Sequence, residues 1–115
     1  MVSPVSERKC VPCLRQLDAI LTSLRLARAT ISERDKFRAH AHLEHAEYNR
    51  REMENLECLP KDTLSYLESQ LKVASEAVDR KDWSEAEWRV DTAFSLTLEP
   101  GLLHIISKYC EEECR

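Results

Sequence analysis

The chain has 115 residues, of which 43% are hydrophobic and 33% charged, a balance typical of one globular domain with a single core. One Gly and four Pro are too few for the turns of an all-β fold, so the composition predicts an all-α protein. No apolar run is long enough for a membrane span, the N-terminus lacks a signal-peptide pattern, and the net charge of −4 argues against nucleic acid as a partner. We therefore expect a cytoplasmic protein.

The spacing of apolar residues predicts four helices, at about residues 11–30, 33–57, 62–80 and 85–114. Pro12 suits the first position of the first helix, because a proline there loses only an N–H that has no partner. The apolar stripe of this helix consists of Leu14, Leu17, Leu21, Leu24 and Ile31, widened by Ile20 and Ala27. Ser32, followed by acidic residues, is the expected N-cap of the second helix.

The second helix has two apolar edges on nearly opposite sides. One edge contains Ala39, Leu43, Ala46 and Met53, and the other contains Phe37, Ala41 and Tyr48. A helix on the surface of a bundle needs only one such edge for the core. The second edge therefore predicts contact with a partner protein or with a second copy of the chain.

The last two helices show the same kind of pattern. In the third, the apolar residues recur at Leu64, Leu67, Leu71, Ala74 and Val78. Ser84 and Glu87 form a capping-box pattern before the fourth, whose inward residues are Ala86, Val90, Ala93 and Phe94. Pro100 should kink or split this helix near residues 99–101. The whole pattern predicts one domain, residues 1–115, folded as an antiparallel up-down four-helix bundle.

The hairpin of the third and fourth helices resembles a tetratricopeptide unit. Ala74, Ala86 and Ala93 stand at the small-residue positions of that repeat and Val73 at its preceding apolar position, whereas the aromatic positions do not match. The similarity covers about 30 residues and occurs once. The resemblance implies a role in protein–protein interaction.

Two cysteine pairs lie near the two ends of the chain, Cys10 with Cys13 and Cys110 with Cys114. With an even number of antiparallel helices, the first helix starts and the last ends on the same side of the molecule, so the four sulfurs can meet. Both spacings suit a structural zinc site, in which four thiolates come from two close pairs. Zinc is therefore one expected cofactor.

The same placement also suits disulfides between Cys10 and Cys114 and between Cys13 and Cys110, with no cofactor. This nested arrangement is similar to the way saposin-type helical domains tie their ends, although that family is extracellular and shorter. Free thiols and a reversible thiol switch are further alternatives. Cys58 has no neighbouring cysteine in the sequence and is expected to be a free thiol.

His42, His45 and Glu52 lie on one flank of the second helix, and His40 lies on the other. Sets of His and carboxylate residues on bundle helices can bind metals or carry out hydrolysis. Trp83 and Trp88 bracket the start of the fourth helix, where tryptophans either pack the junction or form an exposed binding site.

These patterns together favour a non-enzymatic interaction or assembly module whose ends are joined by the cysteine pairs. A thiol-redox or metal-responsive switch is the first alternative. A metal-dependent hydrolase that uses the histidines of the second helix is the second.

Overall fold

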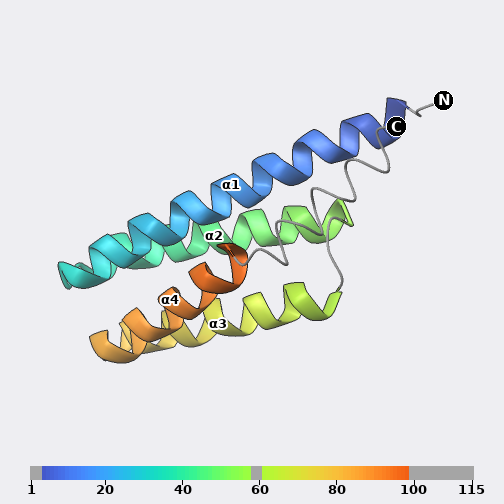
Figure 1. The fold of residues 1–115 in the computed structure, drawn as a ribbon. Coiled ribbons are helices and arrows are strands. Elements are labelled where there is room, and N and C mark those ends of the chain that lie inside the picture. The colour runs from blue at the N-terminus through green and yellow to red at the C-terminus, as the bar shows by residue number, and fades with distance from the viewer. Residues whose placement is uncertain (1–3, 58–60, 99–115) are drawn as a thin grey trace.

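The computed structural model describes the backbone of residues 4–57 and 61–98, which forms an antiparallel four-helix bundle (Figure 1). The helices are α1 (Pro4–Ser32), α2 (Lys36–Asn55), α3 (Lys61–Asp79) and α4 (Trp83–Leu98). Each packs against two neighbours, in the order α1, α2, α3, α4 and back to α1. The all-α bundle is therefore confirmed, whereas the predicted break at Pro100 and the stretch after it lie outside the described residues. Within the described helices, none is both long and apolar enough to cross a membrane.

The core lies along one stripe of each helix, and most of the predicted stripes are buried. The whole predicted set of α3 is inside, as are Ala39, Leu43, Ala46 and Met53 of α2. In α1 the buried set is centred on Ile20, Leu24 and Ile31, while Leu14 is exposed rather than buried. Leu14 falls at the edge of the stripe, because the helical period of 3.6 residues moves it away from the core-facing Cys13 and Leu17.

Two turns of the same design connect α1 to α2 and α3 to α4. In each, a basic residue has a positive φ, 58° at Arg34 and 59° at Lys81. The following aspartate donates its backbone N–H back to the preceding helix, from Asp35 to the Thr30 carbonyl at 2.9 Å and from Asp82 to the Ala77 carbonyl at 2.8 Å. This is the Schellman arrangement, which satisfies carbonyls that the end of a helix leaves unpaired.

The same two aspartates also cap the next helix. A side-chain oxygen of Asp35 accepts from the N–H of Arg38 at 3.1 Å, and one of Asp82 accepts from the N–H of Glu85 at 3.3 Å. The predictions of Ser32 and Ser84 as N-caps are therefore wrong. Ser32 ends α1 instead, because the Schellman turn uses the next three residues and leaves the aspartate at the capping position.

The prediction that Pro12 opens the first helix is also wrong. α1 begins at Pro4 and continues through Pro12. Pro4 takes the first helical position, where the missing N–H has no cost. α1 is consequently 29 residues long, against 16 residues for the described part of α4.

The turn design predicts that Lys81→Gly stabilises the protein. A residue with a Cβ in the left-handed conformation costs about 1 kcal/mol, part of which glycine recovers despite its more flexible unfolded state. We expect the free energy of unfolding, measured by urea denaturation, to rise by about 0.5–1 kcal/mol. Lys81→Ala is the control, which removes the charge but keeps the Cβ. An equal gain from alanine would show that the backbone conformation is not the cause.

Candidate functional site

No hydrogen bond or ion pair joins the side chains of the three residues predicted on one flank of α2. His42 and Glu52 are half-buried and His45 is exposed. Over residues 12–57 and 61–97, whose side chains are described, no group of three or more His, Cys, Asp or Glu side chains is placed to hold a metal ion. The hydrolase alternative therefore has no assembled metal site on this flank.

His40, on the other flank, contacts α3 instead. Its Nε2 lies 2.7 Å from an oxygen of Asp79, and its Nδ1 lies 3.2 Å from the hydroxyl of Ser75. The three residue types match those of a hydrolytic triad, but Asp79 is 61% exposed and Ser75 lies inside α3, where the backbone N–H groups bond within the helix. These two contacts form a polar link between α2 and α3.

A second link between these helices is formed by Arg50, a charged residue with only 4% of its surface exposed. Its guanidinium donates to both carboxylate oxygens of Glu47 at 2.8 Å and to Glu54 at 3.2 Å. It also forms an ion pair of 2.9 Å with Glu68 of α3. The hydrogen bonds to Glu47 are the main reason that the pKa of Arg50 is raised above its ordinary value.

Arg50 is not among the residues predicted from the sequence, although the sequence contains a signal for it. It continues the buried positions of α2 by one turn after Ala46, and Glu47 and Glu54 stand three residues before it and four after it. Beside it, a groove of about 320 Å³ runs between α2 and α3 and is lined by acidic, basic and apolar residues, among them Leu43, Glu44, Glu47, Arg51, Glu68 and Leu71.

The network predicts that Arg50→Lys destabilises the fold by about 1–3 kcal/mol, because lysine cannot reproduce the planar fork that binds Glu47 at two points. Arg51→Lys is a matched control, since Arg51 is exposed and contacts the same carboxylate at 3.1 Å. Its effect should stay below about 0.5 kcal/mol. Chemical denaturation measures both variants, and equal losses would contradict the role of burial.

The second apolar edge predicted for α2 is exposed. Phe37 is 85% exposed and Tyr48 is 62% exposed, and Ala41 between them is also exposed. The intervals of four and seven residues place all three on one side of the helix, opposite the buried Ala39 and Leu43. We call Phe37, Ala41 and Tyr48 the outer α2 face.

The two tryptophans are separated by the fold. Trp83 packs against the core, whereas Trp88 is 56% exposed. The guanidinium of Arg89 lies 4.2 Å from the centre of the Trp88 ring and is itself held by Glu85 at 2.8 Å. With Tyr66, Trp88 lines a shallow groove of about 390 Å³ between α3 and α4, whose other residues are Asp91, Thr92, Ser95 and Leu96.

The cysteine prediction falls mostly outside the described side chains. Cys13 is fully buried at the edge of the core, and its sulfur is not a free thiol. Cys10 belongs to α1, but its side chain is outside the described set, as are Cys58, Cys110 and Cys114. The meeting of the two pairs therefore stays a prediction.

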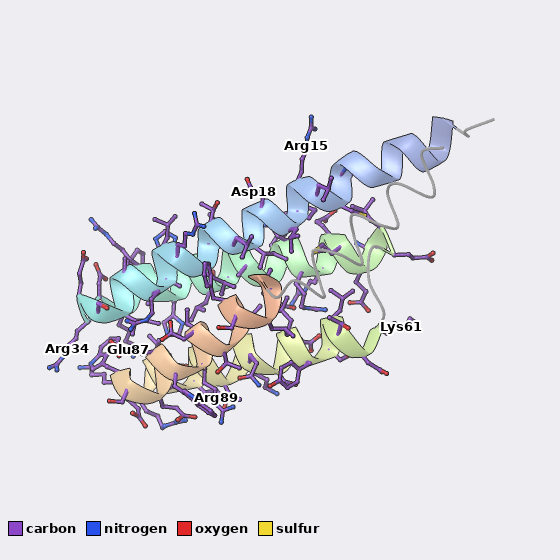
Figure 2. The ribbon with its side chains drawn as sticks, viewed as in Figure 1. Arg15, Asp18, Arg34, Lys61, Glu87 and Arg89 are labelled. Carbon is purple, nitrogen blue, oxygen red and sulfur yellow. The ribbon has the colours of Figure 1, made fainter. Side chains whose placement is uncertain are left out.

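Figure 2 shows that charged side chains project from the outside of the bundle, with Arg15 and Asp18 on α1 pointing away from the other helices and Arg34 at the end of the bundle where α1 meets α2. The candidate contact regions on this surface are thus the outer α2 face and the groove between α3 and α4.

Comparison with known proteins assigns no family: no family model matches the chain, and no curated protein or solved structure matches it.

Proposed function

We propose that this chain is a helical interaction and assembly module that associates with a protein partner, in the first instance a second copy of itself, through the outer α2 face. The observation that carries the proposal is the exposure of Phe37 and Tyr48 on one side of α2. Aromatic side chains give binding sites much of their energy, because they bury a large apolar area and lose little conformational entropy.

The rest of the molecule supports this choice of surface. The inner stripe of α2 satisfies the core, and the links through His40 and Arg50 hold the helix against α3. The outer α2 face is therefore presented by a helix that is fixed on both sides. A rigid helix face can bind without the entropy cost of ordering the backbone.

The test is sedimentation over a wide range of protein concentration. The wild type should associate as the concentration rises, whereas Phe37→Ser/Tyr48→Ser should stay monomeric, because the apolar contact area is lost. Tyr66→Ser/Trp88→Ser, which removes two exposed aromatics from the other surface, is the matched control and should associate like the wild type. Thermal unfolding of all three should agree closely. A wild type that is monomeric throughout, or equal behaviour of the two variants, would contradict the proposal.

A thiol-responsive latch between the ends of the chain is the second candidate. The burial of Cys13 supports it, and disulfides are proposed as the form of the latch, with zinc as the alternative. The proposed pairs are Cys10 with Cys114 and Cys13 with Cys110. A cytoplasmic location stays part of the proposal. In most organisms the cytosol keeps such thiols reduced, and the cytosol of hyperthermophiles is the exception.

The latch predicts a thiol count. When the folded, unreduced protein is alkylated and analysed by mass spectrometry, only Cys58 should be labelled. After reduction and unfolding, all five cysteines should be labelled. Reduction should also lower the stability by about 2–4 kcal/mol, because the unfolded chain regains the entropy of two long loops. Five labelled thiols before reduction, or one bound zinc per chain, would exclude the disulfide form.

A further inference from the structure

We infer that two copies of this chain pair through their outer α2 faces in antiparallel orientation, around a two-fold axis that passes between Ala41 and Glu44. This inference rests on the proposed self-association and adds the partner's orientation and register. It depends on the distribution of charge along α2, on the order of side chains on its outer face, and on which of its charges lack ion pairs.

Positive and negative charges lie in different parts of α2 and the turn before it. Residues 34–41 contain Arg34, Lys36 and Arg38 against the single Asp35, a net charge of +2. Residues 42–55 contain four glutamates against two arginines, a net charge of −2. Antiparallel pairing about this axis places residues 34–41 of each chain against residues 44–51 of the partner, within its acidic segment, whereas parallel pairing would place like charges together.

The stability of α2 itself does not explain this division. The helix dipole favours acidic residues in the first turn and basic residues in the last. α2 has no acidic residue in its first turn and no basic residue in its last. The order of charges therefore opposes the dipole within one molecule, whereas it is complementary to a second copy in antiparallel orientation.

The apolar residues of the outer α2 face have a matching symmetry. Two large side chains, Phe37 and Tyr48, flank the small Ala41. A two-fold axis between Ala41 and Glu44 sets Phe37 opposite the partner's Tyr48 and Tyr48 opposite the partner's Phe37, and the small residue lies where the helices come closest. In an isologous interface each contact occurs twice, so this register uses both aromatics of both chains.

The charges needed for the contact are available. Arg34, Glu44 and Glu52 form no ion pair with any other described side chain, and Arg38 is exposed, at 3.5 Å from Asp35. By contrast, Glu47 and Glu54 are already bound by Arg50. In this register the numbers of facing residues add up to 85, so Arg34 lies one residue from the level of the partner's Glu52 and Arg38 three residues from the level of the partner's Glu44. One helix face per chain is a small interface, so the dimer should be weak.

Complementary charge reversal tests the orientation. The acidic variant is Arg34→Glu/Arg38→Glu, and the basic variant is Glu44→Lys/Glu52→Lys. Each variant alone has the same sign along all of α2 and should self-associate at least about tenfold more weakly than the wild type. An equal mixture should form a heterodimer at least as tight as the wild-type dimer, because every opposed segment then carries opposite charge. Sedimentation of mixtures with one labelled variant measures this, and the effect should weaken with added salt.

Arg15→Glu/Asp18→Lys is the control, because these exposed residues of α1 point away from the bundle (Figure 2). It should dimerise like the wild type. If the mixture does not associate, or if either variant alone pairs as tightly as the wild type, the antiparallel arrangement is wrong. If the antiparallel arrangement is wrong but the Phe37→Ser/Tyr48→Ser variant still loses association, the proposed function is retained. A wild type that never dimerises would overturn both.

Discussion

The constraint on which the rest of this structure depends is the pair of three-residue turns that close its two hairpins. In each turn one aspartate completes the end of the preceding helix and caps the start of the next, so no residue is left over between the two helices. Such a short connection forces the helices to be antiparallel neighbours. It also fixes their relative height, which decides which residues of α1 and α2, or of α3 and α4, face each other.

The two hairpins then join along two seams, which differ in character. Between α1 and α4, Arg28 pairs with Glu87 at 3.1 Å and with Asp91 at 2.9 Å, and all three are substantially exposed. Exposed pairs of this kind contribute little to stability. The seam between α2 and α3 contains the buried Arg50, whose donors must all be satisfied because an unpaired buried charge is costly. This seam fixes how α2 is rotated, and with it the direction of the outer α2 face.

The proposed function depends on that rotation. α2 buries its inner stripe and anchors its flank against α3, so the side carrying Phe37 and Tyr48 has no partner among the described residues. A large exposed aromatic surface on a rigid helix is typical of a binding site. In the proposed dimer, the charges that oppose the helix dipole favour a second copy in antiparallel orientation. The latch proposed for the cysteines concerns the opposite end of α1 and is independent of this face.

The sequence by itself determined the all-α class, the positions of the four helices to within a few residues at most ends, and the inner stripes of α2 and α3, because these depend on period and composition within single segments. It also showed that α2 has a second apolar edge. Capping was mispredicted, since Ser32 and Ser84 are good caps locally and only the Schellman turns give Asp35 and Asp82 that position. The partners of His40 and Arg50, the separation of Trp83 from Trp88, and the exposure of Phe37 and Tyr48 were decided only by the tertiary structure. Each of these depends on which residues of different helices share a level and a face, and that register is set jointly by both turns and by the packing of the core.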